Sequence, residues 1–454
     1  MIQLKEKNNN NQSQKPKRKF RKWVSRIILL FVLLFVFPFV VLCAFHLHDE
    51  DLTEDAKAFF TSSDIDPNKN FFVTWTGIHA PPEGDMRSFG QGVFDGSINR
   101  RDVQLLRFND DDIPYKRYCE RQDEYELYNP HYEETACYSD DDIKLLLDKN
   151  QKIISRLERL YAETDQLNVN MGGRTNVGYI SWQDVIAMQG LLCRKWIGQS
   201  ENGEGKQAIE SWVTSTRAIK YIMNGQLNFV DQTILQIIYS RNIYCIPTIL
   251  EKDTSLINTY GDQLIDILNF NYLEQRNVLK MLQAHGSFMK EFEVSDSFIL
   301  RFFYQSNRAK NKYYNGSLDI LNLSRVAPSD INSEALKLKK KYECSIYQAS
   351  NCLLYSLILN RYFLKFEQDG EMFLSAAMTT AQQKATVLWI KAHMQNISQD
   401  EIAGFLQNTS SELFDPISNQ PFYWDEERKS IYHNIYYIED GTHQQRDLVY
   451  YKND

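Results

Sequence analysis

Four polar side chains in the second half of the chain have the types that ligand binding needs. Glu274 carries a carboxylate, and Gln305, Asn307 and Asn311 carry amides. Each amide offers two N–H donors and a carbonyl acceptor, so the group can hydrogen-bond a carbohydrate or a peptide. Amides also cap helix ends and fasten turns, a structural use that needs no ligand and is the more common one. The sequence leaves both uses open.

Motifs of familiar catalytic centres are missing from the chain. It has no nucleophile elbow, His-Glu-x-x-His zinc motif, phosphate-binding loop, dinucleotide fingerprint or Ser-x-x-Lys pair in its required context. A hydrolase that uses two carboxylates needs no such motif, because the fold brings the two acids together. Glu274 is the first candidate acid for such an enzyme, with Gln305 and Asn307 orienting the substrate.

No metal site and no cofactor is predicted. The acidic triplets at 110–112 and 140–142 lack the alternating Asp spacing of a calcium loop. The 8 histidines are scattered along the chain, and no close Cys or His pairs have the spacing of a zinc site.

An uncharged apolar segment runs from Ile27 to Phe45 and is interrupted only by Pro38. At about 1.5 Å of rise per residue, such a helix spans about 28 Å, close to the hydrocarbon core of a bilayer. The segment is longer than the apolar region of a cleaved signal peptide. Nine Lys or Arg residues precede it, which places the N-terminus in the cytoplasm. We expect a basic, disordered head at 1–26, an uncleaved transmembrane anchor at 27–46 and a domain outside the cytoplasm.

The chain beyond the head is acidic. Its head carries a net charge of +8 and the whole chain −8, so the remainder carries −16. Nucleic-acid binding needs a positive footprint, and the acidic body is therefore not expected to bind nucleic acid. The expected partners are the membrane, through the anchor, and another protein.

Six of the 7 cysteines follow the anchor. An even number facing an oxidising compartment suits disulfides, and six cysteines allow fifteen pairings. Their spacing favours a bond between Cys119 and Cys137, across an acidic segment with little apolar periodicity of its own.

Apolar residues recur with the 3.6-residue period of a helix over most of the body. They predict helices at 143–161, 182–197, 206–223, 231–245, 262–282, 345–366 and 371–394. Residues 65–98, rich in Gly and Pro, are expected to be irregular. After residue 410, aromatic and branched residues between turn residues predict two or three short strands. We expect a mostly α-helical extracytoplasmic domain at 47–410, with an irregular lead-in, and a small β-rich tail at 411–454.

Three short segments form recognisable patterns. They are Asn70-Phe-Phe-Val-Thr-Trp-Thr-Gly77-Ile-His-Ala80-Pro81 followed by Gly90, then Gln305-Ser-Asn307-Arg-Ala-Lys-Asn311, and the tail pattern Asp415-Pro416…Pro421-Phe-Tyr423…Tyr432…Asp440-Gly441. These segments resemble an uncharacterised family of bacterial single-pass inner-membrane proteins with a helical extracytoplasmic domain. In the second segment, Ser306 stands where the family has proline. The resemblance implies an inner-membrane anchor and a periplasmic domain, and the family's biochemical role is itself unassigned.

Together these patterns favour a non-catalytic envelope protein over an enzyme. The expected role is that of an acidic helical scaffold, tethered to the bacterial inner membrane, that binds another envelope protein. Aromatic residues make up 13% of the chain, and some of them can form a contact surface. The alternative is a cell-wall or carbohydrate hydrolase that uses paired carboxylates.

Overall fold

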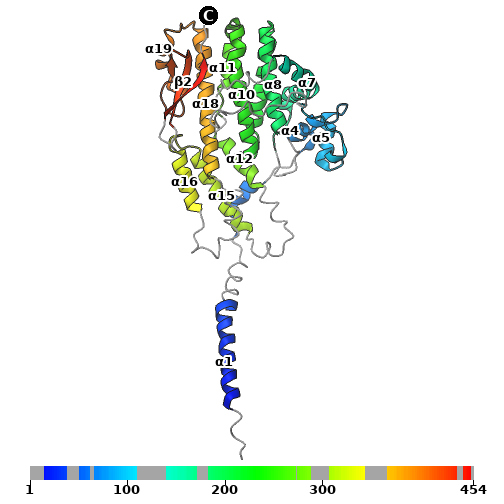
Figure 1. Cartoon of the computed structure of the whole chain (residues 1–454), viewed down its shortest axis with the longest axis vertical. Coiled ribbons are helices and arrows are strands. Elements are labelled where there is room, and N and C mark those ends of the chain that lie inside the picture. Colours follow the sequence, from blue (N-terminus) through cyan, green and yellow to red (C-terminus); the bar gives the residue numbers. More distant parts are fainter. Residues whose placement is uncertain are drawn as a thin grey trace, which may run out of the picture.

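The structure, a computed structural model, is mostly α-helical with a small sheet near the C-terminus. It describes residues 15–37, 51–61, 66–109, 140–170, 182–271, 274–287, 306–342, 366–436 and 443–450. Long helices stand side by side in one body, and the short helices α4 (Phe71–Thr76) and α5 (Met86–Asp95) lie on the flank opposite the sheet (Figure 1). α1 (Lys15–Phe31) lies apart from this body (Figure 1).

Most of the predicted helices are confirmed. The long helices are α7 (Asp140–Glu163), α8 (Trp182–Glu201), α9 (Gly205–Met223), α10 (Phe229–Lys252), α11 (Ser255–Leu268), α12 (Gln275–Ser287), α15 (Ser306–Leu323), α16 (Ile331–Tyr342) and α18 (Phe366–Met394). The shorter ones are α3 (Glu54–Phe60), α19 (Ile402–Gln407) and the 3-10 turns η2 (Pro67–Lys69), η3 (Gly77–His79), η4 (Arg100–Asp102), η6 (Thr164–Gln166) and η9 (Ser411–Leu413). The helix predicted at 345–366 lies almost entirely outside the described residues.

One predicted helix, at 262–282, is two helices in the structure. α11 ends at Leu268, and Asn269 leaves the helical conformation with φ −77° and ψ 76°. α12 begins at Gln275. Both helices bury one apolar face, so the stripe continues across the break and the sequence pattern alone does not show it.

The lead-in at 65–98 contains helices, so the prediction of an irregular segment was wrong there. Asn70 caps α4: its side-chain oxygen accepts from the backbone N–H groups of Phe72 and Val73, at 2.9 and 3.2 Å. Gly90 lies inside α5 and Gly77 directly follows α4, and both let the two helices cross closely. A Cβ on Gly90 would lie 1.9 Å from the carbonyl oxygen of Val73, and one on Gly77 would lie 1.8 Å from that of Met86. These glycines are required for packing between α4 and α5.

A buried network of side-chain amides and hydroxyls joins four helices of the body. Gln189 of α8 donates to the Oδ1 of Asn242 of α10 at 2.6 Å, and Tyr161 of α7 donates to Gln189 at 3.0 Å. Asn242 in turn donates to Thr216 of α9 at 3.0 Å. Gln189 and Asn242 are fully buried. Each amide is satisfied only when the four helices keep their relative positions.

Two hydrophobic clusters form the core, and α18 contributes to both. The larger cluster lies among α4, α7, α8, α9, α10, α11 and the second half of α18. The smaller one is built by α3, α12, α15, α16 and the beginning of α18, where Phe366, Met372 and Phe373 are buried. α18 has 29 residues. At about 1.5 Å per residue it spans about 44 Å, which is long enough to run through both clusters.

The tail forms an antiparallel sheet, as predicted, with strands β1 (Tyr423–Asp425), β2 (Ser430–Tyr436) and β3 (His443–Tyr450) in the order β1-β2-β3. Asp415 closes the loop before it by accepting from Ser418 Oγ at 2.6 Å and from the backbone N–H groups of Ile417 and Ser418. Its Oδ1 lies 3.4 Å from Nδ1 of His433 on β2. Burial raises the pKa of Asp415, but His433 and these hydrogen bonds outweigh that effect and lower it. The Asp-Pro pattern therefore fastens the loop to the sheet.

The N-terminal helix covers only part of the predicted anchor. α1 continues into the π-helical turn η1 (Val32–Val36), and its apolar side chains are exposed. Residues 38–46 lie outside the described part of the chain. Among the residues that are described, no helix combines the length and the apolar character needed to cross a membrane.

The close crossing of α4 and α5 gives a stability prediction. Gly90→Ala should lower the free energy of unfolding by about 3 kcal/mol, because the added methyl group overlaps the Val73 carbonyl and forces the helices apart. Gly198→Ala is the matched control, since a Cβ there meets nothing within 4 Å. It should stabilise α8 by about 0.5 kcal/mol or more. Denaturant unfolding of the full-length protein measures both, and equal effects of the two changes would contradict the packing role of Gly90.

Candidate functional site

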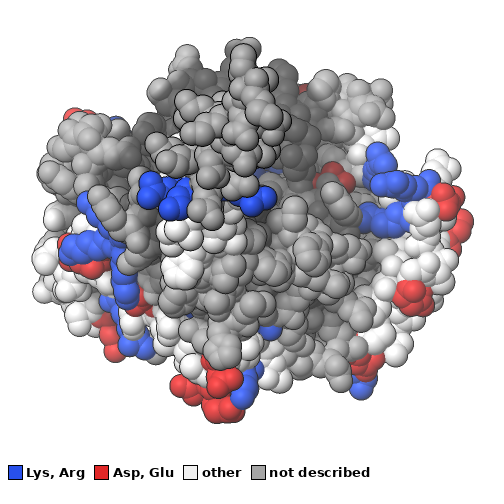
Figure 2. Space-filling view, turned by 90° about the horizontal axis from the view of Figure 1, so that it is seen from below, with Lys and Arg blue, Asp and Glu red and all other residues white. Residues whose placement is uncertain are grey.

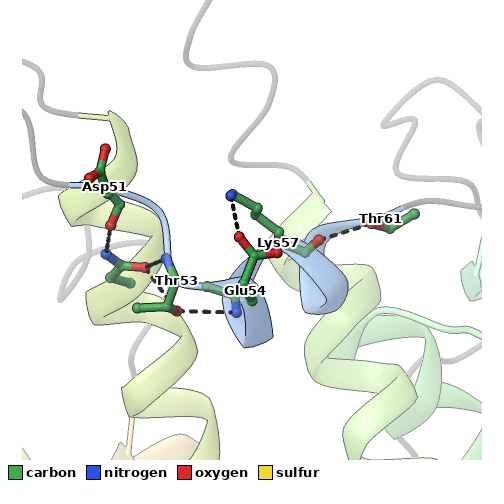
Figure 3. A network of polar contacts seen from close by, with 7 residues as sticks. Asp51, Thr53, Glu54, Lys57 and Thr61 are labelled. Atoms are coloured by element: carbon green, nitrogen blue, oxygen red, sulfur yellow. Dashed lines mark hydrogen bonds and ion pairs between the residues drawn. The ribbon is translucent and has the colours of Figure 1, made fainter.

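Asn311, predicted as a ligand-binding amide, binds the chain's own backbone. Its Oδ1 accepts from the N–H of Thr53 at 3.1 Å and from the Thr53 hydroxyl at 3.3 Å, and its Nδ2 donates to the carbonyl oxygen of Asp51 at 2.9 Å. Thr53 caps α3 by accepting from the N–H of Ala56. Figure 3 shows this polar network around Asp51, Thr53, Glu54, Lys57 and Thr61. Asn311 therefore joins the beginning of the body to α15.

Two of the other three predicted residues, Asn307 and Glu274, lie in the described part of the chain. Asn307 lies one turn before Asn311 on α15 and is half-buried. Glu274 is exposed, and its backbone oxygen accepts from the N–H groups of Asn277 and Val278 at the start of α12. Gln305 lies outside the described residues, as do Cys119 and Cys137 of the predicted disulfide.

The lead-in motif surrounds one guanidinium group, which the sequence analysis did not single out. Arg156 of α7 is buried and donates to five backbone carbonyl oxygens. They belong to Ile78 (3.0 Å), Ala80 (2.6 Å), Pro81 (2.9 Å), Pro82 (3.2 Å) and Gly84 (3.0 Å). Burial lowers the pKa of Arg156 below its ordinary value. The planar guanidinium group of Arg156 thus holds the turn after Gly77 with several N–H donors at once. The ammonium group of a lysine does not offer donors in this arrangement.

A buried carboxyl lies at the start of α10, next to a pair of tryptophans. Asp231 is 5% exposed, and its Oδ2 has no hydrogen-bond partner. The side chains of Trp182 and Asn228 hydrogen-bond the carboxyl, and the Trp182 ring lies 5.6 Å from that of Trp75. Burial dominates over these bonds and raises the pKa of Asp231 from 3.8 to about 7. A large share of the Asp231 carboxyl is therefore protonated near neutral pH.

His79 presents a second unpartnered atom close to Trp75 in the chain. Its Nδ1 lies 3.0 Å from the carbonyl oxygen of Leu106, and because a carbonyl only accepts, Nδ1 carries the proton. Nε2 is buried without a partner. Burial lowers the pKa of His79, opposed by the Leu106 hydrogen bond and by Asp184 of α8. The lead-in therefore contributes the ring of Trp75, which lies against Trp182 of α8, and the buried imidazole of His79.

Weak sequence signals mark Arg156 and Asp231. Arg156 lies beside the apolar stripe of α7, between Ile153 and Leu157, where a charge needs a partner. Asp231 follows Asn228 by three residues at a helix start, a position that ordinarily has an exposed acid facing the helix dipole. Its burial follows from the packing of α10 in the body and was not visible in the sequence.

Comparison with known proteins returned no match: no family model, no curated protein and no solved structure is similar to this chain. The resemblance to inner-membrane proteins stays a prediction carried by the quoted segments. Function is inferred from the contacts of the chain's own side chains.

Replacing Asn311 should loosen the attachment of α3. Asn311→Ala removes the acceptor of Thr53 and the donor to Asp51, and we expect a loss of about 2 kcal/mol in the free energy of unfolding. Asn311→Asp keeps the acceptor and should lose less. Limited proteolysis between residues 46 and 61 measures the local effect, with Asn332→Ala, an exposed amide on α16, as control. Unchanged cleavage in Asn311→Ala would contradict the attachment.

Asp231 should make stability depend on pH. Below about pH 3.8 the carboxyl is protonated in the folded and the unfolded chain, and its contribution is complete. As the pH rises from about 3.8 to about 7, the unfolded chain ionises before the folded one, so the free energy of unfolding falls by about 4 kcal/mol over this range and then levels off. Asp231→Asn should abolish this part of the decline, and Asp262→Asn, exposed on α11, should not. Denaturant unfolding between pH 4 and 8 checks it; an equally steep decline in Asp231→Asn would contradict the assignment.

Proposed function

We propose that the protein is a non-catalytic scaffold of the bacterial envelope, anchored in the inner membrane by residues 27–46 and binding another envelope protein through its helical body. The N-terminus lies in the cytoplasm and the body in the periplasm. The charge asymmetry of the sequence supports this orientation, since the net charge is +8 before the anchor and −16 after it.

The contact of Asn311 with Asp51 and Thr53 carries the proposal. Only four residues, 47–50, separate the end of the anchor from Asp51, and the five steps of the chain from 46 to 51 span at most about 18 Å. The body is thus attached to its own first residues immediately outside the membrane. Lys and Arg as well as Asp and Glu lie on the end of the body seen from the side of α1 (Figure 2), so neither sign of charge dominates among the residues described there. The proposal therefore assigns membrane attachment to the anchor at 27–46.

Polar side chains of the three quoted sequence patterns have internal structural uses. Asn311 holds α3, Asn70 caps α4 and donates to the carbonyl oxygen of Asn170 at 2.6 Å, and Asp415 closes the loop before the sheet. These residues therefore stabilise the fold of the body. A scaffold needs such a rigid body and no reacting group of its own.

The alternative, a carboxylate-based hydrolase, is favoured by one observation. The Asp231 carboxyl has a pKa raised to about 7, the property that a general acid needs at neutral pH. Glu274, the acid predicted for this role, is exposed instead. Asp231 replaces it as the first acid to test, with Asp184 of α8 as the second.

Topology and binding test the scaffold. Alkaline phosphatase fused after Asp454 should be active in a bacterial host, because it would reach the periplasm. The full-length protein, cross-linked in membranes, should recover one envelope protein at a fixed ratio, and a chain ending at residue 50 should not. An inactive fusion, or a body that recovers no protein at a fixed ratio, would contradict the proposal.

Digestion of peptidoglycan by the full-length protein tests the alternative. We expect no release of fragments. Release that is lost in Asp231→Asn or Glu274→Gln, with the fold retained, would overturn the scaffold and establish the hydrolase.

A further inference from the structure

Two buried cysteines from neighbouring helices meet beside Asn242. Cys193 lies on α8 and Cys245 on α10, and both thiols are free in the structure. The Cys193 sulfur lies 3.9 Å from the Oδ1 of Asn242 and 3.9 Å from the carbonyl oxygen of Arg241. Cys245 is one turn beyond Arg241, and its sulfur lies 3.4 Å from the carbonyl oxygen of Asn242. Both sulfurs therefore contact Asn242.

Joining the two sulfurs would leave no acceptor of Asn242 unsatisfied. Its Oδ1 also accepts from Gln189 at 2.6 Å, and its backbone oxygen also accepts from the indole N–H of Trp212 at 2.7 Å. The S–H groups are therefore supplementary donors. Losing them costs the buried network little, because a penalty arises only when an acceptor is left without any donor.

The backbone beside Cys245 has one hydrogen bond fewer than a regular helix. Pro247 lies inside α10, two residues after Cys245. Proline has no N–H, so the carbonyl oxygen of Ile243 lacks its usual partner one turn later. α10 can therefore adjust at this turn more easily than elsewhere.

We propose that a disulfide bond between Cys193 and Cys245 ties α8 to α10. The proposal rests on the periplasmic location of the body under the proposed function, since a disulfide persists in an oxidising compartment. The oxidant is the disulfide of a thiol–disulfide oxidoreductase. The two thiols lose two protons and two electrons as the S–S bond forms, and the disulfide of the oxidoreductase takes them up and becomes a dithiol. Of the fifteen pairings of the six cysteines after the anchor, three contain this bond.

The disulfide forms during folding, before the two cysteines are buried. Burial raises the pKa of the Cys245 thiol, and the neighbouring Cys193 raises it further. Exchange requires a thiolate, so folded, reduced protein reacts slowly. Cysteines exposed during folding meet the oxidoreductase without that barrier.

Peptide mapping of the full-length protein tests the bond. Membranes from a bacterial host are denatured with an alkylating agent present, digested without reductant and analysed by mass spectrometry. We expect one linked peptide containing Cys193 and Cys245, lighter than the two free peptides by two hydrogens and separated by reduction. Cys193→Ser should make Cys245 available for alkylation, and Cys245→Ser should do the same for Cys193. Cys43→Ser is the control and should leave the linkage intact.

The activity of the phosphatase fusion distinguishes failure of the disulfide proposal from failure of the proposed periplasmic location. Complete alkylation of Cys193 and Cys245 in wild-type membranes whose fusion is active overturns the disulfide and leaves the proposed function standing. An inactive fusion overturns the location; the disulfide is then decided by refolding the denatured full-length protein in a glutathione redox buffer. A linked Cys193–Cys245 peptide in that buffer supports the bond, and free thiols or another pairing overturn it.

Discussion

The contact between the amides of Gln189 and Asn242 fixes how the helices of the body fit together. Apolar stripes hold helices against each other but allow several relative positions. If one helix slides along another, a new set of apolar contacts of similar energy can form. A buried amide does not allow this freedom, since a slip of one residue leaves donors and acceptors unsatisfied at about 1–3 kcal/mol each. Tyr161 of α7 and Thr216 of α9 make further hydrogen bonds to these two amides. The positions of α7 and α9 are therefore fixed by Gln189 and Asn242 as well.

The helical nature of the body could be predicted because its helices are amphipathic and long. α7, α8 and α9 each bury a stripe that repeats at the helical period, and that stripe is visible in the sequence. The lead-in was misjudged because glycine serves two purposes that look alike in a sequence. Gly77 and Gly90 permit the close approach of two helices, whereas Gly96 ends α5 in the left-handed conformation with φ 80°. Only the neighbouring element distinguishes the two uses.

The candidate site was predicted less well than the fold, because burial depends on contacts between distant residues. Asn311 was predicted as a ligand-binding candidate with a structural use left open, and in the structure its side chain bonds Asp51 and Thr53. The pKa of Asp231 depends on Trp182, which lies on another helix. Arg156 depends on a turn more than seventy residues earlier in the chain. Such pairs leave no mark in a single sequence beyond a charge close to an apolar stripe.

The attachment of α3 has a consequence for the order in which the protein is made. Thr53 and Asn311 are 258 residues apart, and Phe59 and Phe60 are buried with residues of α12, α15 and α18. α3 is synthesised early, whereas the other buried residues of its cluster come from the second half of the chain. The larger cluster also needs the second half of α18, so neither core is complete until that helix has been made. Until α18 has been synthesised, Phe59 and Phe60 lack the native neighbours that bury them.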